Sequence, residues 1–142
     1  MKGKEDELAR QLIEVIPRTM WSLRNGLRSA AESEFTVPQF RILARLFQAP
    51  ATNGELAEAI GISVPAASRM VDALVKRGLL SRTQRTADRR QVALNLSPVG
   101  RRKFMSVRNA AQSRFSIQIA SLDPLRRQAL ADGLDVLQEV FE

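Results

Sequence analysis

The stretch that decides the fold is residues 52–96, TNGELAEAIGISVPAASRMVDALVKRGLLSRTQRTADRRQVALNL. Thr52 and Ser63 each stand where a hydroxyl can cap a helix, and a glycine stands where each helix would end. The helical spacing of apolar residues then gives way to alternation, which predicts short strands over residues 80–83 and 92–96. The stretch therefore predicts two short helices joined by a glycine turn, followed by a β-hairpin.

Outside this stretch the chain is predicted to be helical on both sides. Apolar residues recur at three- and four-residue steps over residues 4–33, which predicts one long amphipathic helix, bent near Pro17. Thr36 and Gln39 have the spacing of a capping box and predict the start of a second helix. Two further helices are expected to begin at Ser97-Pro98 and Asp123-Pro124.

This order of four helices, a hairpin and two helices predicts a mainly α fold with a small β-hairpin wing, a winged helix-turn-helix with long N- and C-terminal helices. We expect a single structural domain. Residues 36–96 would form the winged helix-turn-helix lobe, and residues 1–35 and 97–142 a helical dimerisation region. Dimerisation is expected because the first and last helices carry wide apolar stripes, which a lone chain of 142 residues would struggle to cover.

Composition argues against several classes of protein. The chain has no cysteine and no histidine, so disulfides, thiolate metal sites and the commonest general acid and base are absent. We therefore expect no enzyme activity, no catalytic residues, no metal and no cofactor. No apolar run approaches the length of a membrane span, and the charged start MKGKEDELARQL lacks the apolar region of a secretory signal. A cytoplasmic, nucleoid-associated protein is expected.

The net charge of +7 is concentrated in one part of the chain. Residues 63–108 hold eleven basic and two acidic residues, a balance of +9, which leaves −2 for the rest. A basic block in an otherwise nearly neutral chain is typical of a protein that binds a polyanion. The alternative is a solvated face that only promotes solubility.

The second helix of the predicted helix-turn-helix is a candidate for the recognition helix, which enters the major groove of double-stranded DNA. Its outward residues are small apart from one long arginine, so the backbone can approach the groove floor and the arginine can reach a guanine. Ser63 is interpreted mainly as a cap, although the helix N-terminus that it exposes can also hold a phosphate. The candidate DNA contacts on this helix are Ser63, Pro65, Ala66, Ser68 and Arg69.

The loop between the predicted strands is rich in arginine. Three arginines on one hairpin tip repel one another without a partner, and a narrow minor groove offers concentrated negative potential. A carboxylate there opposes DNA unless it holds an arginine in a fixed orientation. We therefore interpret Asp88 as the brace of Arg90, which enters the minor groove, and Arg89 as a second or phosphate contact. Arg85 completes the candidate contacts of the wing.

Two segments resemble the MarR family of bacterial transcriptional regulators. They are GELAEAIGISVPAASRMVDALVKRGLLSR at residues 54–82 and TADRRQVALNLSPVG at residues 86–100. The second contains the Asp-Arg-Arg motif of the family's wing at residues 88–90. TVPQFRILARL at residues 36–46 and the flanking long helices also fit, so the resemblance extends over nearly the whole chain.

The resemblance implies an obligate homodimer in which the first and last helices intertwine. It also implies that the helix over residues 63–77 reads the major groove and that Arg90 enters the minor groove with support from Asp88. Two-fold symmetry then predicts a pseudo-palindromic operator with half-sites about 10 bp apart.

Members of this family often bind small anionic or phenolic ligands between the dimerisation region and the DNA-binding lobe. The resemblance therefore implies a small aromatic or anionic ligand here. The candidate lining residues are Trp21, Arg24, Phe40 and Phe47, although aromatic residues at helical spacing also occur as ordinary core.

The leading hypothesis is a dimeric, sequence-specific transcriptional repressor that a small molecule releases from its operator. The alternative is an architectural or counter-silencing protein that binds A·T-rich DNA by charge and groove shape, with weak sequence preference and no ligand. The small residues around Ser68 allow that alternative. The two differ in sequence discrimination, because phosphate contacts supply affinity without sequence information.

Overall fold

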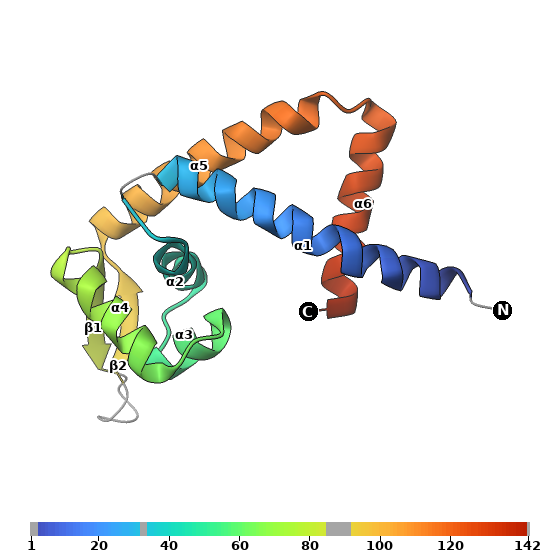
Figure 1. The fold of residues 1–142 in the computed structure, drawn as a ribbon. Helices are drawn as coiled ribbons and strands as arrows, with labels where there is room; N and C mark the ends of the chain where they lie inside the picture. Colours follow the sequence, from blue (N-terminus) through green and yellow to red (C-terminus); the bar gives the residue numbers. More distant parts are fainter. Residues whose placement is uncertain (1–2, 32–33, 85–91, 142) are drawn as a thin grey trace.

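The computed structural model describes residues 3–31, 34–84 and 92–141 (Figure 1). The order of its elements is the predicted one: helices, an antiparallel two-stranded hairpin, and two more helices. The mainly α fold class with a β-hairpin wing is confirmed. The elements are α1 (Lys4–Ala31), α2 (Val37–Gln48), α3 (Asn53–Ile60), α4 (Val64–Lys76), β1 (Leu80–Gln84), β2 (Val92–Leu96), α5 (Pro98–Ala120) and α6 (Pro124–Phe141).

Side-chain caps set the starts of the helices. The hydroxyl of Thr36 accepts a hydrogen bond from the backbone N–H of Gln39 at 3.3 Å, and the side chain of Gln39 accepts one from the N–H of Thr36 at 3.0 Å. The predicted capping box is therefore present. Thr52, Ser63, Ser97 and Asp123 likewise accept from the N–H three residues on.

Two glycines end the helices of the helix-turn-helix. Gly61, after α3, has φ of +72°, and Gly78, after α4, has φ of +73°. These are left-handed backbone conformations that side chains with a Cβ rarely adopt. The turn between α3 and α4 and the end of α4 therefore lie where the sequence predicted them.

The hydrophobic core lies inside the lobe. Side chains from α2, α3, α4, the hairpin and the start of α5 pack together, and the largest of them are fully buried. These fully buried side chains are Ile42, Leu43, Leu56, Val71, Leu74, Leu79 and Leu94.

The hairpin is attached to this core through Leu80 of β1 and through Ala93 and Leu94 of β2. β1 pairs with β2 in a register that sets Leu80 opposite Leu96 and Gln84 opposite Val92. Ala51, just before α3, forms an isolated antiparallel bridge with Leu94 of β2. The middle of β2 is therefore hydrogen-bonded to the start of the helix-turn-helix.

The long helices extend away from the lobe. α5 leaves it alongside α1, and α6 then turns back toward the N-terminal half of α1 and faces it across a groove (Figure 1). α1 continues through Pro17 as one helix. None of the described side chains of α6 is buried. No helix in the described ranges combines the length and the apolar character needed to cross a bilayer.

Candidate nucleic-acid interface

One face of α4 packs in the core and the opposite face is open. Ala67, Val71 and Leu74 are fully buried. Arg69 and Pro65 are exposed, and Ala66 and Ser68, also predicted as contacts, are half-buried. The first turns of α4 therefore present a surface of small side chains with one long cation.

Ser63 is engaged as a cap, as the sequence analysis mainly interpreted it. Its Oγ accepts a hydrogen bond from the N–H of Ala66 at 3.2 Å. The residue is exposed, so the start of α4, with its positive end of the helix dipole, is open to solvent. An anion can approach there.

The hairpin stands beside α4. Arg82 of β1 donates a hydrogen bond to the carboxylate of Asp72 on α4, and the two form an ion pair. Across the hairpin, the Asn95 side chain donates to the Thr83 hydroxyl at 2.7 Å. The predicted wing contacts Arg85, Asp88, Arg89 and Arg90 lie outside the described residues.

The structure divides the basic block of residues 63–108 between two roles. Some of its cations lie on the open face of α4, among them Arg69 and Lys76. Others contact the protein: Arg77 donates to the backbone oxygen of Glu34 at 2.7 Å and lies over the ring of Phe35 at 5.4 Å. Lys103 pairs with the Glu34 carboxylate at 3.2 Å. The charge count alone therefore overstates the cations free to meet a polyanion.

A cavity of about 550 Å³ lies between α1, α2 and α5. Its lining is mainly apolar and includes one cation, Arg108. The guanidinium of Arg108 lies 4.8 Å from the ring of Phe47 and 5.8 Å from that of Phe104. Its Nε is buried without a hydrogen-bond partner among the described residues. The lining consists of Leu27, Phe40, Ala44, Phe104, Arg108, Ala111, Gln112, Phe115, Ser116 and Ile119.

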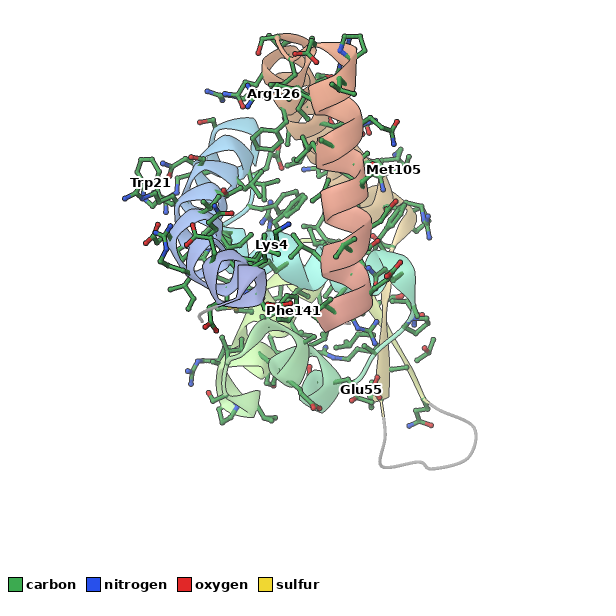
Figure 2. All side chains as sticks on the ribbon, turned by 90° about the vertical axis from the view of Figure 1, so that its right-hand side faces the viewer. Lys4, Trp21, Glu55, Met105, Arg126 and Phe141 are labelled. Atoms are coloured by element: carbon green, nitrogen blue, oxygen red, sulfur yellow. The ribbon has the colours of Figure 1, made fainter. Side chains whose placement is uncertain are left out.

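The structure brings together two of the four predicted ligand residues. Phe40 lines the cavity, and Phe47 lies next to it, since the rings of both residues contact Phe104 with centroids at 5.1 and 5.0 Å. Arg24 and Trp21 are exposed on α1 and do not line it. Trp21 points to the side of α1 that faces away from α6 (Figure 2).

Sequence reasoning placed Arg108 only in the basic block and did not connect it with the cavity. A signal was present. Phe104, Val107, Arg108, Ala111 and Phe115 follow the three- and four-residue steps of an apolar helix face, and a lone cation in such a stripe marks a polar group facing an apolar space.

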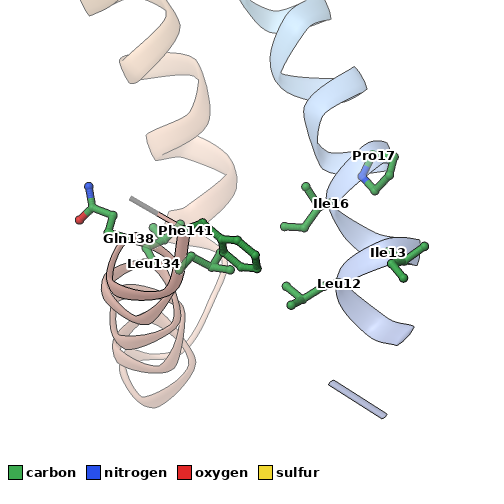
Figure 3. Close-up of a pocket in the computed structure, with 8 residues that line it drawn as sticks. Leu12, Ile13, Ile16, Pro17, Leu134, Gln138 and Phe141 are labelled. Atoms are coloured by element: carbon green, nitrogen blue, oxygen red, sulfur yellow. The ribbon is translucent and has the colours of Figure 1, made fainter. Parts of the chain in front are cut away.

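A second hollow separates α1 from α6. It is an apolar groove of about 890 Å³, shown in Figure 3. An adjoining groove of about 580 Å³ continues along α6. The residues that line the first groove are Leu12, Ile13, Ile16, Pro17, Leu134, Leu137, Gln138 and Phe141.

Comparison with known proteins agrees with this geometry. The MarR family model matches residues 35–92, from the residue before the α2 cap to the first residue of β2. An uncharacterised helix-turn-helix transcriptional regulator of Bacillus subtilis strain 168, YfiV, is 24% identical over 110 residues, which are 77% of this chain and 69% of YfiV.

Solved structures share the fold over nearly the full length. RV1404 from Mycobacterium tuberculosis has a TM-score of 0.79 at 24% identity and covers 99% of this chain and 95% of its own. The transcriptional repressor CouR, bound to a 23-mer DNA duplex, has a TM-score of 0.71 at 27% identity, with 97% and 99% covered. BpsR of Bordetella bronchiseptica, whose DNA binding 6-hydroxynicotinic acid regulates, has a TM-score of 0.68 at 23% identity, with 90% and 93% covered. The resemblance predicted from the sequence is confirmed.

Proposed function

We propose that this chain, a DNA-binding transcriptional regulator with the winged helix of the MarR family, is a homodimeric repressor that a small anionic ligand releases from a pseudo-palindromic operator. The observation that carries the proposal is the open face of α4 with the hairpin fixed beside it. A helix of this kind enters the major groove while the hairpin reaches the neighbouring minor groove.

Base reading is assigned to the first turns of α4. Arg69 is exposed, and its neighbours Ala66 and Ser68 are small enough for the helix to lie close to the base edges. The Arg69 guanidinium would bind a guanine through its O6 and N7 atoms. Pro65 would lie against the groove wall, and the open N-terminus at Ser63 would hold a phosphate.

Minor-groove contact is assigned to the wing. Arg90 would enter the groove, Asp88 would hold it in orientation, and Arg89 and Arg85 would contact phosphates. The support for this assignment is the position of the described strands: Gln84 and Val92, the residues on either side of 85–91, stand opposite each other at the end of a hairpin that lies beside α4.

Dimerisation is assigned to residues 1–35 and 97–142. No side chain of α6 is buried, although Leu125 is 82% exposed and Phe141 is 70% exposed. Most helical stability in proteins comes from packing of an apolar face, and the described chain supplies little of that packing to α6. A second copy seated in the apolar groove between α1 and α6 would bury both helices and set the two recognition helices on one face.

Ligand release is assigned to the cavity between α1, α2 and α5. The buried, unpartnered Nε of Arg108 fits a carboxylate, and the rings of Phe40 and Phe104 fit an aromatic body. The cavity lies between the lobe and the long helices, so an occupant can change the angle between them. The regulation of BpsR by an aromatic acid agrees with this assignment.

The primary test is sequence discrimination. Duplexes that the full chain retains from a random pool would be titrated against scrambled versions of the same composition. Discrimination by about a thousandfold or more is expected for a sequence-specific regulator at physiological salt. A promoter that carries the selected site should lose transcription when the protein is present. Equal affinities would contradict the proposal and support the architectural alternative.

Two variants separate the contacts. Arg90→Ala should cost about 1–3 kcal/mol of DNA binding, the scale of one specific contact. Arg69→Ala should relax preference at one base position in each half-site, whereas a uniform loss would identify a phosphate contact.

The ligand assignment has its own test. Benzoate and 6-hydroxynicotinate would be titrated into the protein–DNA complex, with thermal unfolding of the free protein measured in parallel. Binding that lowers DNA affinity and disappears in Arg108→Gln is expected. Binding that survives in Arg108→Gln but disappears when Trp21 or Arg24 is replaced would move the site to the exposed side of α1.

A further inference from the structure

The ion pair between Asp72 and Arg82 joins the two elements assigned to DNA. Asp72 lies on α4 and Arg82 on β1, and the guanidinium donates to the carboxylate. Within the described ranges, no other hydrogen bond between side chains links α4 to the hairpin. The hairpin is otherwise attached through its backbone: the N–H of Leu79 donates to the carbonyl of Leu74 at 3.0 Å, and Leu94 exchanges hydrogen bonds of 2.8 and 3.2 Å with Ala51 before α3.

Arg82 is an exposed cation on the same face of β1 as the buried Leu80. Alternation puts Leu80, Arg82 and Gln84 on one face of β1, and the register sets Arg82 opposite Leu94 on the same face of the hairpin. Leu80 and Leu94 are buried, whereas every residue of β1 after Leu80 is exposed. The hydrophobic core therefore anchors β2 as far as Ala93, opposite Thr83, but anchors β1 only at Leu80. Beyond that point the side chain of Arg82 joins β1 to α4.

Asp72 places a negative charge where it would weaken DNA binding. Asp72 is exposed one helical turn after Arg69, so it lies on the side of α4 that meets the phosphate backbone. A free negative charge there repels DNA. Both partners are about half exposed, and exposed pairs contribute little to folding stability. A contribution to folding stability therefore does not account for an acidic residue at this position.

We propose that Asp72 is a positioning residue for DNA binding: through Arg82 it fixes the angle of the hairpin relative to the recognition helix. The inference rests on the assignment of α4 and the hairpin to DNA. A hairpin held at the correct angle before binding loses less conformational freedom on binding, so both grooves are contacted at lower entropic cost. The pair also neutralises the Asp72 carboxylate.

The substitution Asp72→Asn tests the proposal by the sign of its effect. It removes a negative charge near the phosphates, so electrostatics alone would tighten DNA binding. Loss of the hairpin's fixed angle would instead weaken it, and we expect a loss of about three- to tenfold. Glu58→Gln on α3 is the matched control, because it makes the same charge change in the same lobe and should leave binding equal or tighter. Binding of Asp72→Asn equal to or tighter than that of the parent would overturn the proposal.

A charge swap tests whether the pair acts as a unit. Asp72→Arg and Arg82→Asp should each weaken binding, and the double variant should recover much of the combined loss because it restores the pair in reverse. Purely additive effects would contradict the proposal. Thermal unfolding of every variant should stay near that of the parent, which separates this role from loss of the fold.

Footprinting locates the effect. In Asp72→Asn, protection of guanine N7 in the major groove should persist, while hydroxyl-radical protection of the minor groove beside it should weaken. Equal weakening in both grooves would contradict a role in the hairpin angle. If the parent protein itself fails to discriminate a selected site, the proposed function fails. If the parent discriminates and Asp72→Asn does not weaken binding, only this inference fails.

Discussion

The lobe and the long helices of this molecule differ in how far their apolar side chains are buried within the chain. Every buried hydrophobic residue of the described chain lies between Phe35 and Ala111, that is, in the lobe, just before it, or in α5 as far as Ala111. α6 buries none, and the N-terminal half of α1 faces it across an apolar groove. The same kinds of side chain, mainly leucine, isoleucine and valine, are enclosed in one region and exposed in the other.

This difference shows that the same amphipathic pattern forms a core in one part of the chain and leaves an exposed apolar face in another. In the lobe, five elements converge, so each apolar face meets another within the same chain. In α6 and the N-terminal half of α1, the described apolar side chains stay exposed or half-buried, and we propose that a second copy covers them. The lobe should therefore respond to substitutions as a core does, and the long helices as an interface does.

The largest effect is expected from a charge on the uncovered face of α6. Leu137 lines both adjoining grooves. Leu137→Asp should dissociate the proposed dimer and lower operator affinity by about a hundredfold to ten-thousandfold, because two linked half-sites bind far more tightly than one. Sedimentation and DNA titration measure the two effects. Ala131→Asp adds the same charge outside both groove linings and should remain dimeric. A Leu137→Asp protein that stays dimeric would refute the assigned interface.

A core truncation in the lobe comes next. Leu74 is fully buried, and Leu74→Ala should lower the free energy of unfolding by about 2–5 kcal/mol, with the cavity left behind adding to the lost burial. Chemical denaturation measures it. The matched variant Leu137→Ala should have an effect that depends on protein concentration, as expected for an interface. A concentration-dependent loss in Leu74→Ala as well would erase the distinction between the two regions.

A smaller effect is expected where α1 meets α5. A Cβ on Gly26 would lie 2.5 Å from Cζ of Phe115, so the ring must move. Gly26→Ala should destabilise the protein by about 1–3 kcal/mol in thermal or chemical unfolding, as overpacking does. Gly54→Ala is the control, because the nearest atom to its new Cβ would be 3.9 Å away. If both variants were equally stable, α1 and α5 would not pack as closely as described.

The smallest effect is expected at a helix cap. Thr36→Ala removes the acceptor for the N–H of Gln39 and should cost about 1 kcal/mol of stability. The same change at Thr19, inside α1, should cost less, because that hydroxyl donates only to the backbone oxygen of Val15 within a continuous helix. A larger loss at Thr19 than at Thr36 would reverse the expected ranking.

Much of the fold could be predicted because its signals are local. A hydroxyl three residues before an N–H in need of an acceptor and a glycine at a left-handed position act over one turn of chain. The change from helical to alternating spacing is local too. Thr36, Ser63, Gly61 and Gly78 therefore behave as predicted, and α4 presents Arg69 outward.

The residues that reasoning from sequence missed or placed differently depend on contacts between distant segments. Arg108 stood in a run of basic residues, yet it is directed into an apolar cavity by the way α5 packs against α1 and α2. Trp21 and Arg24, predicted beside Phe40, lie on the exposed side of α1, because helical spacing gives an angle around one helix and not the direction of its neighbours.

The sequence by itself determined the order of elements and their caps, since short-range hydrogen bonding and apolar spacing encode these directly, and its motifs carried the resemblance to the MarR family. Only the tertiary structure decided which cations face outward, which aromatic rings gather around Arg108, and that Asp72 meets Arg82 across ten residues of chain. It also decided that the apolar faces of the lobe are covered while those of α6 are not. The physical reason is that burial and charge pairing depend on which surfaces the fold brings together, and spacing along the chain does not specify that.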